Sequence, residues 1–275
     1  RRAARLGRAR GGMGTYFSVP IVAPLDIDAI HKAEKEARRT KVFLLRNAGL
    51  SAVPRRLPKM TSLREVDLSS NRIVELPFEM GELSRMRVLN VSHNILAQLP
   101  ASLGDCDQLR VLNAAYNCIE SIPKTFKHLE RLQELDISFN HLVDVQPSIS
   151  ECRQLTYLNM SDNLIEELPA EFGHLVALFE LNVSYNRIAE IPEEFSTLLS
   201  LKKLDIRGNS IHSIPRAVLT DSSLDRLYTN GNPVHSELKL QDGYDVFWER
   251  MVLRIKQRGW PPDPNPTRLK GWGDS

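Results

Sequence analysis

Cysteine is scarce in this 275-residue chain, and its three copies, Cys106, Cys118 and Cys152, lie far apart without any Cys-x-x-Cys pair. An odd number of widely spaced cysteines favours neither a disulfide framework nor a zinc site, so a reducing compartment fits best. Long apolar runs are also missing, since no stretch approaches the roughly 18 to 20 apolar residues of a membrane-spanning helix. The remaining composition, 42% hydrophobic and 25% charged, is typical of a globular, water-soluble protein.

Motifs that mark common enzyme classes are missing as well. The sequence holds no Gly-x-x-x-x-Gly-Lys-Ser/Thr loop, no Gly-x-Gly-x-x-Gly turn after a strand and no Gly-x-Ser-x-Gly elbow. Its seven histidines are scattered, and none has metal-ligand spacing to Cys, Asp or Glu. We therefore predict a protein that is not an enzyme, with no catalytic residue, no cofactor, no metal and no small-molecule substrate.

Basic charge is concentrated at the start of the chain. Residues 1–12 carry five arginines and no acid, so the net charge of +2 becomes −3 for residues 13–275. A mildly acidic body argues against general nucleic-acid binding, which requires a basic surface. The Arg- and Ala-rich start is similar to part of an organellar transit peptide, but an untranslated leader or the remnant of a longer chain would look the same.

One pattern, Leu-x-x-Leu-x-Leu-x-x-Asn-x-Ile-x-x-Leu-Pro, recurs along most of the chain. In an earlier copy, Ala48 replaces the asparagine while the other positions are kept, so we count nine repeats of 23 residues from Thr40 to Val234. The eight asparagines of the pattern follow one another at intervals of 23 residues: Asn71, Asn94, Asn117, Asn140, Asn163, Asn186, Asn209 and Asn232.

Each position of this pattern has a structural interpretation. Alternation predicts that Leu89 and Val91 point into the core from a short strand, while Val88 and Asn90 point outward. The asparagine is expected to bond backbone groups where the chain turns, and the Leu-Pro pair begins the return segment on the convex side. No repeat can bury its apolar side alone, so stability comes from stacking and the two open ends need caps. In this arrangement Cys106 and Cys152 take leucine positions and are expected to be buried and inert.

The predicted caps are helical. At the N-terminal end, Asp26 or Asp28 would be the N-cap of a helix that turns Ile27, Ile30 and Ala33 inward. At the C-terminal end, a helix would place Phe247, Met251 and Ile255 on one face. We thus expect five segments: a basic extension and extended segment (1–25), an N-terminal capping helix (26–39), the repeats (40–234), a C-terminal capping helix (235–258) and a Pro/Gly-rich tail (259–275).

The repeat pattern resembles that of leucine-rich repeat proteins, in particular the intracellular Ras-suppressor-like class. The segments 41–54 and 219–251 are similar to the opening and closing segments of a smaller family, that of leucine-rich-repeat-containing protein 57. The resemblance implies an α/β solenoid shaped as a curved horseshoe with a parallel concave sheet. It also implies a non-enzymatic interaction protein, without implying a particular partner.

A partner protein is expected on the concave face, because outward positions vary there while the core positions do not. Nine strands at about 4.8 Å spacing give a surface on the order of 40 Å long, which suits a protein of standard interface size. Apolar and aromatic residues gather at its centre, with charged residues around them, as in interface hot spots. The predicted partner-binding residues are Glu65, Val88, Val111, Tyr116, Glu134, Phe139, Tyr157, Glu180, Tyr185, Lys203, Arg207 and Arg226.

Met13, Gly14 and Ser18 form Met-Gly-x-x-x-Ser, the pattern of N-myristoylation at the start of a chain. Members of the resembled family begin with such a signal, so Gly14 is the expected acyl acceptor if Met13 initiates translation, and it is internal and unmodified otherwise. We expect a cytoplasmic scaffold or adaptor with weak, reversible membrane contact through this lipid. A structural subunit of a ciliary or organellar complex, or a regulatory subunit for a small GTPase or phosphatase, would share the same sequence features.

Overall fold

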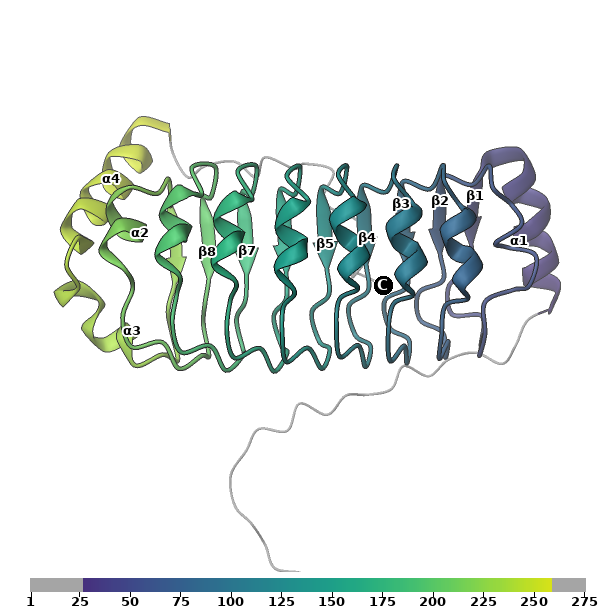
Figure 1. Cartoon of the computed structure of the whole chain (residues 1–275), viewed down its shortest axis with the longest axis horizontal. Helices are drawn as coiled ribbons and strands as arrows, with labels where there is room; N and C mark the ends of the chain where they lie inside the picture. The colour runs from purple at the N-terminus through teal and green to yellow at the C-terminus, as the bar shows by residue number, and fades with distance from the viewer. Residues whose placement is uncertain (1–26, 259–275) are drawn as a thin grey trace, which may run out of the picture.

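The computed structural model describes residues 27–258, which form a solenoid of stacked repeats. Nine strands make one parallel sheet in chain order, and each strand pairs with the next in a register of 23 residues (Figure 1). This confirms the predicted fold. The strands are β1 (Val42–Leu44), β2 (Glu65–Asp67), β3 (Val88–Asn90), β4 (Val111–Asn113), β5 (Glu134–Asp136), β6 (Tyr157–Asn159), β7 (Glu180–Asn182), β8 (Lys203–Asp205) and β9 (Arg226–Tyr228).

Short helices line the side of the solenoid opposite the sheet (Figure 1). Most of them follow a proline whose extended backbone sets the direction of the chain, as Pro100 does with φ −68° and ψ 140°. All but the last are 3-10 helices of five residues. They are η1 (Phe78–Glu82), η2 (Ala101–Asp105), η3 (Lys124–His128), η4 (Pro147–Glu151), η5 (Ala170–His174) and η6 (Glu193–Thr197), followed by α2 (Arg216–Thr220).

The asparagine of each repeat ties that repeat to the one before it. Asn140 is typical: its Nδ2 donates to the carbonyl groups of Ala114 (3.0 Å), Ile137 (3.1 Å) and Ser138 (3.0 Å), and its Oδ1 accepts from the N–H of Ile119 (2.9 Å). Equivalent bonds recur at all eight asparagines, from Asn71 to Asn232. Backbone groups that a turn would leave unpaired in the core are thus satisfied.

The cysteines at leucine positions are buried as predicted. Cys106 and Cys152 are both 0% exposed, and burial raises the pKa of each thiol to about 12. Both are therefore protonated at neutral pH and unreactive, because only the thiolate is a nucleophile.

The N-terminal cap is α1 (Ile27–Thr40), which contacts β1. Its buried residues are Glu34 and Ala37, while Ile27 is 59% exposed, so the prediction that Ile27 turns inward is wrong. Ile30 and Ala33, which were also expected to turn inward, do pack against the core, whereas Ile27 lines an open groove together with Leu44. Asp28 lies inside this first turn rather than at the N-cap, and Asp26 lies outside the described residues.

The C-terminal cap consists of α3 (Val234–Glu237), η7 (Leu238–Leu240) and α4 (Tyr244–Arg258). Phe247 is buried in the core, Met251 is half-buried against it, and the side chain of Ile255 lies outside the described residues. Arg250 donates to the carbonyl groups of Thr220 (2.8 Å) and Leu219 (2.7 Å) at the end of α2. The predicted extension with Gly14 and the predicted tail also lie outside the described residues.

None of the helices in residues 27–258 is long and apolar enough to cross a membrane. Within the same residues, no three His, Cys, Asp or Glu side chains are grouped as metal ligands.

Replacing Asn140 by Ala should destabilise the protein severely. The carbonyl groups of Ala114 and Ile137 and the N–H of Ile119 would lose their partner, at a cost of about 1–3 kcal/mol for each buried group. We expect the free energy of unfolding, measured by urea denaturation, to fall by about 3 kcal/mol or more. Asn230→Ala, at an exposed position outside the ladder, is the control, and an equal loss in both variants would contradict the structural role of Asn140.

Candidate functional site

The concave face carries the first outward residue of each strand in a single row. The sheet register aligns every member with its neighbour, so residues that are 23 positions apart in the sequence lie side by side. The row contains eight of the predicted partner-binding residues: Glu65, Val88, Val111, Glu134, Tyr157, Glu180, Lys203 and Arg226.

The second outward position has a structural role. Asp67 Oδ1 accepts from the backbone N–H of Ser69 (2.9 Å), and Asn90 Oδ1 accepts in the same way from Ser92 (3.0 Å). The side chain thereby holds the backbone two residues further on, where the strand ends. The same bond is made at Asn113, Asp136, Asn159, Asn182 and Asp205, which explains why this position varies little between repeats.

The next turn places unusual residues in the left-handed backbone region. His93, Tyr116, Phe139 and Tyr185 have φ between 53° and 55°, at the position where later repeats have Gly208 and Gly231. This conformation costs an L-residue on the order of 1 kcal/mol or more, and bulky residues adopt it rarely. Glycine or asparagine would suit the turn better, so the aromatic side chains at this position need a reason other than local folding.

Three of these rings form a stack along the face. The centroids of His93 and Tyr116 are 4.2 Å apart with 10° between their planes, and those of Tyr116 and Phe139 are 4.1 Å apart with 8° between the planes. Tyr185 is outside this ring stack and lies over Gly208, where an added Cβ would be 2.6 Å from the tyrosine ring. The structure thus brings together Tyr116 and Phe139, and adds His93, which the sequence analysis did not select.

A hollow of about 650 Å³ lies on the face along the ring stack. Val111 and Tyr157 line it together with the three stacked rings, while Glu134 and Asp136 add two acids. No lysine or arginine is among its lining residues in the described part of the chain. An apolar or positively charged side chain therefore suits this hollow better than an anionic one.

Two of the acids expected to border the apolar centre are buried. Glu134 and Glu180 are only 9% and 8% exposed. Glu180 accepts from Lys203 Nζ on the next strand at 2.7 Å, and this ion pair holds both groups against the sheet. The acids thus belong to the floor of the face rather than to its edge.

The C-terminal part of the face is basic and aromatic. Arg207 pairs with Asp205 at 2.6 Å, and its guanidinium lies 5.5 Å from the ring centroid of Tyr228, with Lys203 Nζ at 5.8 Å from the same ring. Such distances are those of cation–π contacts. Tyr228 was missed in the sequence, although it stands out there as the aromatic at the position that Asp or Asn takes in earlier repeats.

Burial within the ring stack shifts the titration of its members. Burial lowers the pKa of His93, which favours the neutral imidazole. The pKa of Tyr116 is raised, first by burial and then by the negative charges of Asp162 and Asp136. Burial also raises the pKa of Asp162, against a hydrogen bond from Ser161 that lowers it. The carboxylates of Asp136 and Asp162 therefore lie close enough to the ring stack to shift the pKa of Tyr116.

Repeats that stack in register along one parallel sheet define the class of solenoid repeat proteins, which have an open concave face. The sequence model described as "Leucine rich repeat" matches residues 61–119, 84–142 and 130–188. This chain is a leucine-rich repeat protein.

Solved structures show the same fold. A leucine-rich repeat protein of Leptospira interrogans has a TM-score of 0.61 at 24% identity, over 80% of this chain and 59% of its own. The plant peptide hormone receptor RGFR1 in complex with RGF2 has a TM-score of 0.61 at 28% identity, over 66% of this chain and 30% of its own. A TDR receptor has a TM-score of 0.65 at 25% identity, over 70% and 34%. The chain thus spans less than two thirds of the length of each of them, and no curated protein matches it.

The position of His93 in the ring stack leads to a prediction about its pKa. In Tyr116→Ala the imidazole loses the ring that buries it, so its pKa should rise toward the usual value of about 6.5, as measured by NMR. Tyr185→Ala, which removes an exposed ring of the same turn position, should leave this pKa unchanged. A depressed pKa in the folded state means that the unfolded state binds the proton first, so stability should fall as the pH drops below about 6.5. An unchanged His93 pKa in Tyr116→Ala would contradict the stack.

Proposed function

We propose that this chain is a non-enzymatic scaffold or adaptor that binds a partner protein on the concave face. The observation that carries the proposal is the ring stack of His93, Tyr116 and Phe139 beside the hollow. Aromatic side chains next to a concavity are the usual anchors of protein interfaces. Tyr116 is 37% exposed and Tyr185 is 55% exposed, so neither ring serves the core.

The lining of the hollow suggests the kind of side chain that a partner presents. Glu134 and Asp136 make it acidic, and the faces of Tyr116 and Phe139 are attractive to cations. A partner segment with an apolar or basic side chain at its centre fits these properties. That the similar receptor RGFR1 is seen in complex with RGF2 supports a role in binding other molecules.

The remaining predicted residues would form the rim of such an interface. Glu65 lies toward the N-terminal end of the face, while Lys203, Arg207 and Arg226 lie toward the C-terminal end. A polar rim around an aromatic centre adds specificity and association rate more than affinity. The resemblance to the family of leucine-rich-repeat-containing protein 57 supports the same role, without naming a partner.

The test is the recovery of partners on the purified full chain. We expect the double variant Tyr116→Ala, Phe139→Ala to lose at least about tenfold in affinity for a partner found with the unchanged protein, because central aromatic anchors dominate interfaces. Phe78→Ala, Leu240→Ala is the matched control, since it removes two exposed apolar side chains elsewhere. Equal binding by the correctly folded ring variant would refute the proposal.

We also propose that Gly14 is N-myristoylated and contributes a weak membrane contact. The support is the Met13-Gly14-x-x-x-Ser18 pattern together with the family resemblance. A single myristoyl chain binds membranes with a constant of only about 10⁴ per molar, so attachment would be reversible. Intact-protein mass spectrometry of the protein from its source should show a chain that begins at Gly14 and carries an added acyl mass. A chain that retains Arg1 would rule this out.

A further inference from the structure

One rim of the solenoid carries a continuous row of cations. The residue immediately before the strand is Lys41, Arg64, Arg87 or Arg110 in the first four repeats. Their backbones are joined directly, since Arg64 N donates to Lys41 O (2.8 Å), Arg87 N to Arg64 O (2.7 Å) and Arg110 N to Arg87 O (2.8 Å). Their Cα atoms are therefore about one strand spacing apart, near 4.8 Å. We call this row the basic rim.

The protein itself does little to neutralise the basic rim. None of the ion pairs among the described residues involves Lys41, Arg64, Arg87 or Arg110. The three arginines are exposed. Like charges in a row repel one another weakly in water, and an anion bound along the rim would relieve this repulsion.

The basic rim continues into a pocket at the N-terminal end. Arg38, Lys41, Arg56 and Lys59 line a concavity of about 390 Å³, in which the acid is Glu34. Glu34 pairs with Arg56 at 3.2 Å, and Lys41 Nζ donates to the carbonyl of Arg38 at 2.8 Å. Four cations against one acid make this pocket attractive to an anionic group.

Acids do lie near the rim, but they are fewer than the cations. Asp107 and Glu130 are at the repeat position that Arg153 occupies in a later repeat. Arg153 itself pairs with Glu151 at 3.3 Å. The neighbouring position holds two further cations, Arg85 and Arg131, of which Arg131 donates to the neutral Gln108 at 2.6 Å.

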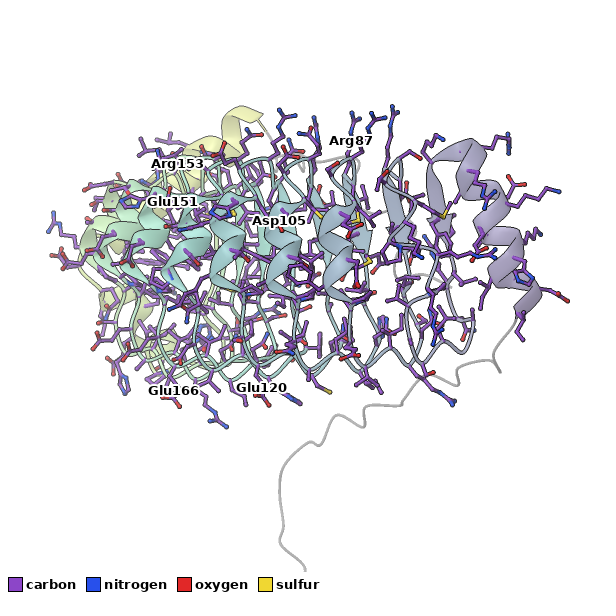
Figure 2. All side chains as sticks on the ribbon, turned by 45° about the vertical axis from the view of Figure 1, so that its right-hand side comes forward. Arg87, Asp105, Glu120, Glu151, Arg153 and Glu166 are labelled. Atoms are coloured by element: carbon purple, nitrogen blue, oxygen red, sulfur yellow. The ribbon has the colours of Figure 1, made fainter. Side chains whose placement is uncertain are left out.

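The opposite rim has the other charge. Figure 2 shows Glu120 and Glu166 at one edge of the solenoid and Arg87 and Arg153 toward the other, where Glu151 lies beside Arg153 and pairs with it. The exposed charge is therefore unequal across the width of the molecule, and an extended anionic surface would orient it with the basic rim inward.

Toward the C-terminus, the same rim becomes apolar. Val176 and Leu199 take the place of Arg153 in the next two repeats and are 57% and 65% exposed. Phe179, half-buried, takes the place of Arg87. The basic rim and these aliphatic side chains lie along the same edge, with the aliphatic groups about three strands further on. Cations and exposed aliphatic groups on one surface are typical of proteins that bind anionic membranes, where the cations meet lipid headgroups and the apolar groups enter the acyl boundary.

We propose that this rim, from the Arg38–Lys59 pocket to Leu199, docks on the surface of an anionic phospholipid bilayer. The site is separate from the concave face, so a partner can be held there while the rim rests on lipid. Docking of this rim on lipid requires no acyl chain, because the cations and the aliphatic side chains belong to the repeats themselves.

The experiment is co-sedimentation of the unacylated full chain with phosphatidylcholine vesicles that contain or lack phosphatidylserine. The test variant is Arg64→Gln, Arg87→Gln, Arg110→Gln, which the fold should accept because Gln133 holds the equivalent position in the next repeat. The control variant, Arg72→Gln, Lys124→Gln, Lys127→Gln, removes the same charge from exposed positions elsewhere.

We expect binding that depends on phosphatidylserine and weakens in high salt. The test variant should lose on the order of a hundredfold in partitioning, since each cation contributes about fivefold, while the control stays near the unchanged protein. Val176→Ser, Leu199→Ser should also weaken binding.

Three results would overturn the proposal. Equal losses in the test and control variants would mean that only net charge matters. Absence of binding to phosphatidylserine vesicles would exclude the membrane. Binding of a labelled oligoglutamate peptide that depends on the three arginines, without binding to vesicles, would assign the rim to an acidic protein segment instead.

Discussion

Every repeat of this protein depends on its neighbour for hydrogen bonds that it cannot make alone. The asparagine ladder expresses this constraint most directly, because each amide bonds a carbonyl and an N–H of the preceding repeat while also closing its own turn. A change in the number of residues between a strand and its asparagine would move the amide away from these groups and leave buried polar atoms unpaired. The fixed spacing of strand and asparagine is therefore a condition of stability, and the helices at the two ends are needed because the outermost repeats have a neighbour on one side only.

The same constraint turns sequence positions into rows. Because successive strands pair in register, any residue type that recurs at one position of the repeat forms a continuous line on the surface. Aromatic residues at the turn after the strand become a ring stack, and basic residues before the strand become a charged rim. Two surfaces of different chemistry thus arise from two positions of one repeat, and they face different directions.

The ring stack illustrates how a binding feature can conflict with local folding. Tyr116 and Phe139 occupy a left-handed turn that glycine takes in Gly208 and Gly231. The unfavourable backbone energy is offset in part by ring contacts across repeats, but the exposed rings contribute little to the core. An exposed apolar group in a strained position is a better indication of function than the same group in a relaxed one. The acids beneath it, Glu134 and Asp136, then limit which side chains can enter the hollow.

The number of repeats, the parallel sheet and the buried cysteines could be predicted from the sequence, because each follows from which positions are apolar at a fixed interval. The helical caps followed from apolar residues at helical spacing, and the repeat register placed Tyr116 and Phe139 on the face. Three features could be seen only in the folded structure: Ile27 is exposed, Glu180 is buried in an ion pair with Lys203, and the ring of Tyr228 lies near both Lys203 and Arg207. These outcomes depend on distances between side chains of adjacent repeats and on which residues of the terminal helix meet the core. A period specifies which residues are neighbours, whereas packing decides which way their side chains turn.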